Sequence, residues 1–281
     1  MHDTAYETGK KFFELYWKPS FKKILDLGSQ NINGTLRDFC PEGAEYLGID
    51  MSEGEGVDFV LSDPYQFPFE NESFDVIVSS SCFEHTTFFW VTFIECIRVL
   101  KREGFLYINA PSNGVYHPYP TDCWRFYPDA AWALAEWSQK NGYDAVSLES
   151  FTCFRKDDIW NDFVAVFGKD LSILPSRVCL SDLCSPVQNV YKGDRTRMLN
   201  LSSSTEDMAR LEESKREIVS LNQLISDRDN LLAELKETLS AREATLSDLN
   251  KTLQDQHNLL VELKKTLSAR ESAVSDLNKT L

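Results

Sequence analysis

The chain has 281 residues, of which 42% are hydrophobic and 12% are aromatic, and its formal net charge is −15. This length and hydrophobic content suffice for one ordinary domain and leave residues for a second element. The 29 basic residues are outnumbered by 44 acidic ones and nowhere form a stripe, which argues against nucleic acid as a partner.

The N-terminus has neither the basic nor the apolar segment of a leader sequence, and the longest apolar stretch, residues 88–94, is too short to cross a bilayer. We therefore expect a cytoplasmic protein with no transmembrane segment. The seven cysteines form no CxxC pair and no Cys/His cluster with zinc spacing. Reduced structural thiols and no metal site are the expectation.

Residues 1–170 alternate strand-like apolar runs with amphipathic helical patterns. This order predicts an α/β domain with a mostly parallel sheet, covered by helices and closed by a hairpin-like pair. The predicted strands are residues 24–27, 46–49, 57–61, 74–79, 105–109, 146–151 and 163–167.

Residues 171–208 contain Pro175, Pro186, Gly193 and three consecutive serines, with little periodicity. Such a composition is typical of a linker. The sequence therefore predicts a connection between the α/β domain and whatever follows residue 208.

Residues 209–281 carry an apolar residue at every seventh position from Leu211 to Leu281. A register sustained over ten heptads predicts a coiled coil, about 105 Å long at 1.5 Å per residue. We expect it to make a homo-oligomer through residues 211–281. Leucine alternates with Arg228, Arg242 and other polar residues at the d positions, so both a dimer and a trimer stay open. The pattern runs to Leu281 without a cap, which leaves a longer natural chain as an alternative.

Small and acidic residues follow successive predicted strands. The loop after the first strand, residues 28–34, has to turn from strand to helix, and Gly28 lets a ligand approach its backbone. A dinucleotide site would have glycine where Gln30 and Asn33 stand, which argues against a dehydrogenase. Asp50 is placed to accept hydrogen bonds from ribose hydroxyls, and Asp63 from an adenine amine, although each acid alone could equally belong to a turn.

This series of motifs resembles the class I methyltransferases, in the subgroup called methyltransferase type 11. The resemblance rests on DLGS at 26–29, YLGID at 46–50, Asp63-Pro64, and the run 74–79 that leads to Phe83-Glu84-His85. It implies a Rossmann-like sheet of seven strands, S-adenosylmethionine over the strand ends, and in-line methyl transfer. The cofactor-binding residues expected on this basis are Asp26, Gly28, Ser29, Gly34, Asp50, Met51, Asp63, Pro64 and Ser79.

The candidate catalytic residues follow the fourth and fifth predicted strands. His85 lies at the expected rim of the cofactor pocket, either packing its wall or contacting substrate. In the loop 110–127, rich in proline and aromatic residues, we expect His117 as general base, Asp122 orienting it and Arg125 binding an acceptor anion. The alternative is a buried Asp122–Arg125 ion pair that folds the loop.

The sequence thus predicts an S-adenosylmethionine-dependent methyltransferase multimerised by its coiled coil. Aromatic side chains in the loop suit sugars, and similar loops in the subgroup occur beside surface-polysaccharide genes, so we expect O-methylation of a carbohydrate or polysaccharide. The glycine-rich loop departs from the family at Gln30. The alternative function is therefore a catalytically silent methyltransferase-like fold that serves as a coiled-coil scaffold or docks a partner.

Overall fold

The computed structural model describes residues 2–155, 160–173, 178–204 and 206–280. It divides into two compact units, residues 1–210 and residues 211–281. Pro175 of the predicted linker and Leu281, the last a position of the predicted coiled coil, lie outside the described residues.

The described part of the first unit contains one sheet of eight strands in the order β3-β2-β1-β4-β5-β7-β6-β8. The first five are parallel, and the pairs β5–β7, β7–β6 and β6–β8 are antiparallel. This confirms the predicted α/β class, whereas the predicted count of seven strands is wrong. The strands are β1 (Lys23–Leu27), β2 (Glu45–Asp50), β3 (Phe59–Val60), β4 (Phe74–Ser80), β5 (Leu100–Pro111), β6 (Val146–Phe154), β7 (Asn161–Gly168) and β8 (Val187–Lys192).

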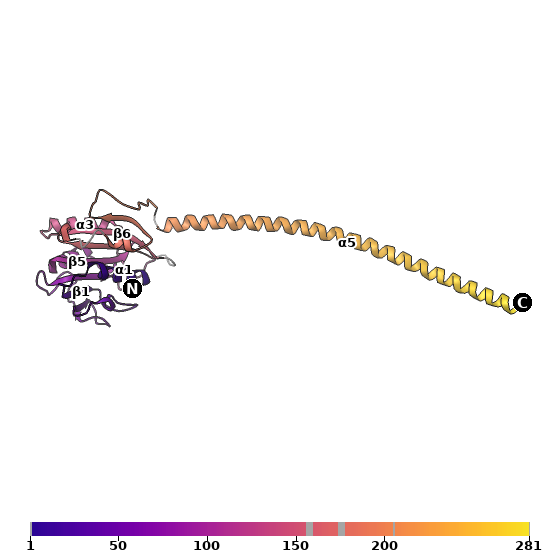
Figure 1. Ribbon diagram of the computed structural model, residues 1–281, viewed down its shortest axis with the longest axis horizontal. Coiled ribbons are helices and arrows are strands. Elements are labelled where there is room, and N and C mark those ends of the chain that lie inside the picture. The colour runs from indigo at the N-terminus through magenta and orange to yellow at the C-terminus, as the bar shows by residue number, and fades with distance from the viewer. Residues whose placement is uncertain (1, 156–159, 174–177, 205, 281) are drawn as a thin grey trace. The chain divides into compact units, whose positions relative to one another are not determined.

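Two hydrophobic clusters lie on opposite faces of this sheet, because successive strand residues point to opposite sides. In β4, Ile77 belongs to the cluster with helices α2 (Phe89–Val99) and α3 (Asp129–Lys140), while Val76 and Val78 belong to the cluster with α1 (Asp3–Tyr16) and α4 (Leu180–Leu183). The sheet is therefore covered on both faces. Ligands of open α/β sheets bind at the carboxyl ends of the strands, so a site is expected there. Figure 1 shows the elements of this unit.

The connection between β1 and β2 contains a short 3₁₀ helix, Leu36–Phe39, where the sequence led us to expect a full helix. Thr35 caps this turn by accepting a hydrogen bond from the N–H of Arg37. Leu36 is buried and packs so closely on Gly9 of α1 that a side chain at residue 9 would overlap it. A tight turn buried beneath α1 thus takes the place of a helix.

The stretch predicted to be a linker, residues 171–208, is only partly irregular, because α4 and the edge strand β8 lie within it. Glu149, fully buried in β6, accepts hydrogen bonds from the N–H groups of Leu180 and Ser181, at 2.7 and 3.0 Å, and from the hydroxyl of Tyr16. These bonds satisfy the first free N–H groups of α4 and hold the segment to the sheet. The sequence could not predict this arrangement, because Glu149 precedes α4 by more than thirty residues.

The last helix is α5 (Glu206–Thr280), and its residues from Leu211 onward make up the described part of the second unit (Figure 1). The predicted helix is therefore confirmed, while its pairing with another chain stays a prediction. The a positions are open to solvent along this unit; Leu232, for example, is 45% exposed. Among the described helices none has the length and apolar character that a bilayer crossing requires.

Asp75 in β4 fixes the start of β1. Its carboxylate accepts hydrogen bonds from the N–H groups of Lys22 and Lys23, both at 2.9 Å, and from the ammonium of Lys101 at 2.8 Å. Burial raises the pKa of Asp75, but these hydrogen bonds outweigh burial and the pKa lies below its usual value. The ionised carboxylate is therefore more stable in the folded protein than in the unfolded chain.

We expect Asp75→Ala to lower the free energy of unfolding by about 2 kcal/mol at pH 7, because several hydrogen bonds to a charged group are lost. Urea denaturation measures this change. Because the folded pKa is the lower one, the difference should persist above about pH 4 and shrink as the pH falls further. The control is Asp144→Ala, whose exposed carboxylate lies 4.0 Å from Arg102; a loss as large as that of Asp75→Ala would contradict the account.

Candidate active site

A cavity of about 720 Å³ opens at the carboxyl ends of the parallel strands. It lies where the sheet order reverses, since β1 pairs with β2 on one side and with β4 on the other. Ligands of open α/β sheets bind at such a switch point. The residues after β1, β2 and β4 therefore face one space.

The loop after β1 turns at Gly28, which has a φ of +79°. Its N–H donates a hydrogen bond to the carbonyl of Ile49 at the end of β2. A Cβ at this position would lie 2.6 Å from the Cβ of Cys82, the residue that follows β4 closely. Glycine is thus required twice, for the backbone conformation and for the close approach of two loops.

Asp50 ends β2 and lines the cavity. Its carboxylate accepts hydrogen bonds from the N–H of Met51 at 2.7 Å and from the N–H of Gln30 at 3.3 Å. Two backbone groups therefore orient a half-buried carboxylate toward the cavity, and its remaining lone pairs are available to hydroxyl donors. This is the position at which the sequence predicts a ribose contact.

Asp26 also lines the cavity but is only 5% exposed. Burial raises the pKa of Asp26 to about 7, although the hydroxyl of Tyr46 donates a hydrogen bond to it at 2.8 Å. The two acids at neighbouring strand ends thus differ, since Asp26 is held in the wall by Tyr46 while Asp50 is presented to the cavity.

Two hydroxyl groups on the cavity wall lack partners. Ser29 Oγ and Ser80 Oγ are buried and find no hydrogen-bond partner among the described residues. Buried polar atoms without partners are uncommon, and a polar ligand in the cavity would satisfy them. These two hydroxyls, together with the backbone at Gly28 that a ligand can approach, fit a nucleoside-type group.

The structure brings together seven of the nine predicted cofactor residues. Asp63 and Ser79 are not among the lining residues: Asp63 accepts a hydrogen bond from the N–H of Tyr65, and the Ser79 hydroxyl donates one to the carbonyl of Leu27. Both side chains stabilise turns and strands. Residues on the wall that sequence reasoning missed include Gln30, Ser80, Cys82, Thr86 and Tyr119.

The loop after β5 reaches the cavity, as its composition suggested. Pro118–Thr121 line the cavity, and the hydroxyl of Tyr119 lies 3.3 Å from Oε1 of Gln30, to which it donates a hydrogen bond. The N–H groups of Cys123 and Trp124 both donate to the carbonyl of Glu84. Backbone contacts thus fasten this loop to the segment that follows β4.

Among the candidate catalytic residues, His85 lines the cavity. Its Nδ1 lies against the carbonyl of Thr121, so Nδ1 carries the hydrogen and Nε2 keeps its lone pair. Burial lowers the pKa of His85, which favours the neutral ring. His85 therefore presents an acceptor atom at the side of the cavity formed by the loop.

His117, Asp122 and Arg125 lie together but are not among the cavity-lining residues. Asp122 is paired with Arg125 through both carboxylate oxygens, at 2.5 and 2.8 Å, and this hydrogen bonding holds the pKa of Asp122 well below its usual range. His117 Nδ1 lies 3.2 Å from Asp122 Oδ2. The arrangement contains the loop-folding ion pair that was the alternative reading of these residues.

Part of this chain is similar to known methyltransferases. Residues 25–108 match a family model described as "Methyltransferase domain". A curated relative, the phthiotriol/phenolphthiotriol dimycocerosates methyltransferase 1 of Mycobacterium ulcerans (strain Agy99), is 34% identical over 34% of this chain. The match spans 41% of the length of that relative. Residues 25–108 are thus similar to a methyltransferase domain.

Two solved structures align with part of the chain. The YcgJ protein from Bacillus subtilis is 13% identical with a TM-score of 0.44, and the alignment covers 60% of this chain and 100% of that one. The 1,6-didemethyltoxoflavin-N1-methyltransferase of Burkholderia thailandensis is 13% identical with a TM-score of 0.46, covering 58% of this chain and 77% of that one. Similarity of this degree says nothing about substrate.

We expect Gly28→Ala to lower the free energy of unfolding by about 3 kcal/mol, because it combines a strained φ with an overlap at Cys82. The matched control is Gly43→Ala, which has a similar φ of +78° but no atom within 4 Å of the added Cβ. It should cost about 1 kcal/mol. Thermal or urea unfolding measures both, and equal losses would show that the contact with Cys82 contributes nothing.

Proposed function

We propose that the chain is an S-adenosylmethionine-dependent methyltransferase that acts on a hydroxyl group. The observation that carries this proposal is the cavity at the switch point of the sheet. There Asp50 is held by two N–H groups, and two buried hydroxyls have no partner in the part of the chain that the structure describes. Bound S-adenosylmethionine would supply a methyl group activated by its sulfonium centre.

Each part of the wall has a separate task in this proposal. Asp50 accepts hydrogen bonds from the ribose hydroxyls, and Gly28 allows the cofactor to approach the backbone. Ser29 and Ser80 offer hydroxyls to its polar groups. His85 and Tyr119, which also line the cavity, contact the acceptor. Much of the acceleration comes from alignment of the reacting atoms.

For the acceptor we propose a carbohydrate. Tyr116, Tyr119 and Tyr127 of the loop are 75%, 58% and 48% exposed, and aromatic rings of this kind pack against sugar faces. The name of the mycobacterial relative also refers to a triol, which is a compound with several hydroxyl groups. A carbohydrate acceptor agrees with both the exposed tyrosines and the triol. An activity screen should also include a lipid polyol, which is the alternative acceptor.

We propose further that α5 multimerises the protein. Its a positions are apolar, exposed and spaced by seven residues through the whole helix. A lone helix of 75 residues buries no apolar stripe, whereas a coiled coil does. Several sites on one scaffold would raise the effective concentration of sites along a polymeric acceptor.

We expect Asp50→Ala to abolish binding of S-adenosylmethionine, with an affinity loss of about 100-fold or more for a charge-assisted pair of hydrogen bonds. Calorimetric titration of the full chain measures this loss. Asp63→Ala is the matched control, since its carboxylate serves a turn outside the cavity wall, and its affinity should stay within a few-fold of the wild type.

Equal losses for Asp50→Ala and Asp63→Ala would contradict the assigned ribose contact. If the folded wild-type protein binds no S-adenosylmethionine, the methyltransferase proposal fails. The silent scaffold, whose working part would be α5, would then be the better account of the chain.

The multimer is tested by Leu246→Asp, which puts a charge at a central a position of α5. Sedimentation equilibrium should give a multiple of the 32.2 kDa chain mass for the wild type and a shift toward 32.2 kDa for the variant. Ala244→Asp adds the same charge at an outer f position and should leave the mass unchanged. A wild-type protein that sediments as a monomer at micromolar concentration would refute this part of the proposal.

A further inference from the structure

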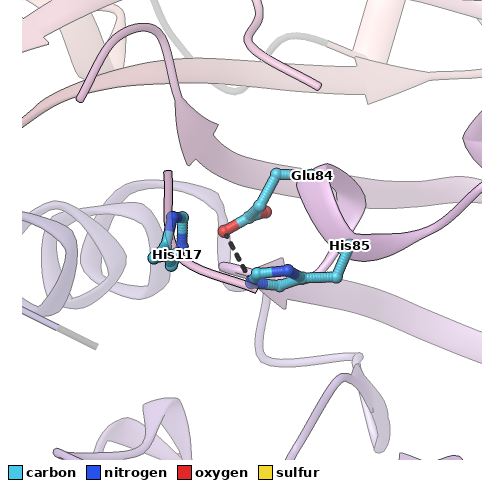
Figure 2. Close-up of side chains that lie close together, drawn as sticks. All are labelled: Glu84, His85 and His117. Atoms are coloured by element: carbon cyan, nitrogen blue, oxygen red, sulfur yellow. Dashed lines mark ion pairs between the residues drawn. The ribbon is translucent and has the colours of Figure 1, made fainter. Parts of the chain in front are cut away.

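We propose that Glu84, His85 and His117 form a binding site for a divalent transition-metal ion on the acceptor side of the cavity. One ligand atom from each of the three residues lies within 4.8 Å of the other two. Figure 2 shows the carboxylate of Glu84 directed toward the ring of His85, with the ring of His117 beside it. A catalytic role of this ion rests on the proposed function.

Glu84 is the strongest indication of a missing partner. Its side chain is 1% exposed, and Oε2 has no hydrogen-bond partner among the described residues. Oε1 lies 3.7 Å from Nε2 of His85, which is too long for a hydrogen bond. Among the described residues the carboxylate therefore has an ion-pair contact with His85 through Oε1, whereas Oε2 is left unsatisfied. A buried carboxylate normally has partners at both oxygens or is bound to a metal.

Both histidines are oriented as metal ligands usually are. The ring of His85 is held by its Nδ1 contact with the carbonyl of Thr121, which leaves Nε2 free on the side of Glu84. The ring of His117 lies with its Nδ1 3.2 Å from the carboxylate of Asp122. A carbonyl or carboxylate behind the ring fixes the tautomer of a ligating histidine and raises its basicity.

The surrounding charges favour a cation. Asp122 and Asp162 act on Glu84 as negative neighbours, and Arg125 acts as a positive one. Asp122 and Asp162 are both buried, with side chains 2% exposed. Because Arg125 is paired with Asp122, the carboxylates of Glu84 and Asp162 are the acidic groups that a divalent ion would offset.

Two imidazoles and one carboxylate form a donor set for Zn²⁺, Fe²⁺, Co²⁺ or Mn²⁺, whereas Mg²⁺ and Ca²⁺ prefer oxygen ligands alone. Three protein ligands also leave a coordination position open. Because His85 belongs to the cavity wall, an ion at its Nε2 would lie beside the acceptor, where it would hold and polarise a hydroxyl oxygen.

The sequence led us to expect no metal site because these ligands have no recognisable spacing. His117 follows His85 by 32 positions in the sequence. They meet because hydrogen bonds fasten the loop to Glu84 and His85. The N–H groups of Cys123 and Trp124 donate to the carbonyl of Glu84, and the side-chain hydroxyl of Thr121 donates to the carbonyl of His85. Only the folded loop shows the cluster.

The test is titration of the full chain, stripped with a chelator, with Co²⁺ alone, followed by visible absorption and calorimetry. We expect one Co²⁺ per chain with ligand-field bands of nitrogen and oxygen ligands, displaced by Zn²⁺. Glu84→Gln and His117→Ala should each weaken binding by about 100-fold. His257→Ala, on the exposed surface of α5, is the matched control and should leave binding unchanged.

Binding that is unchanged in both variants would overturn the proposal, and so would a thiolate-to-cobalt charge-transfer band, which would assign the ion to cysteines. His117 lies in a loop with 36% of its side chain exposed, so His117→Ala decides the question even if Glu84→Gln fails to fold. Titration of the same samples with S-adenosylmethionine separates the two proposals. A protein that binds S-adenosylmethionine but not Co²⁺ refutes the metal site alone, and one that binds Co²⁺ alone refutes the proposed function.

Discussion

The close approach of the β1 loop to the segment after β4 is the constraint on which the site depends. Gly28 touches Cys82 without a side chain between them, and its N–H is bonded to Ile49 at the end of β2. Three strand ends are thereby fixed relative to one another. The carboxylate of Asp50, the hydroxyls of Ser29 and Ser80, and the ring of His85 can face one cavity because this contact is so short.

A second layer of organisation comes from the backbone of Glu84. Its carbonyl accepts hydrogen bonds from Cys123 and Trp124, and these bonds bring the loop after β5 over the cavity. The side-chain carboxylate of the same residue is buried, and its Oε2 has no hydrogen-bond partner among the described residues. One short segment after β4 thus holds the loop, lines the acceptor side through His85, and supplies the proposed metal ligands.

The sequence predicted those features that are local. Apolar runs predicted the seven strands from β1 to β7. The acids and the glycine at the ends of these strands predicted that Asp26, Gly28 and Asp50 would lie in the binding site, and all three line the cavity. Heptad spacing predicted α5. What it could not predict depends on distant contacts, since β8 and α4 are held by the buried carboxylate of Glu149. Likewise, the neighbourhood of His85 and His117 exists only once the loop has docked.

The central claim is that the cavity at the strand ends binds S-adenosylmethionine, and photo-crosslinking with the methyl-labelled cofactor tests it most directly. After irradiation of the full chain and proteolysis, mass spectrometry should find the label in peptides from residues 24–37, 45–65 or 79–88, and excess S-adenosylhomocysteine should suppress it. Label confined to α5, or none above the level of the heat-denatured protein, would contradict the account.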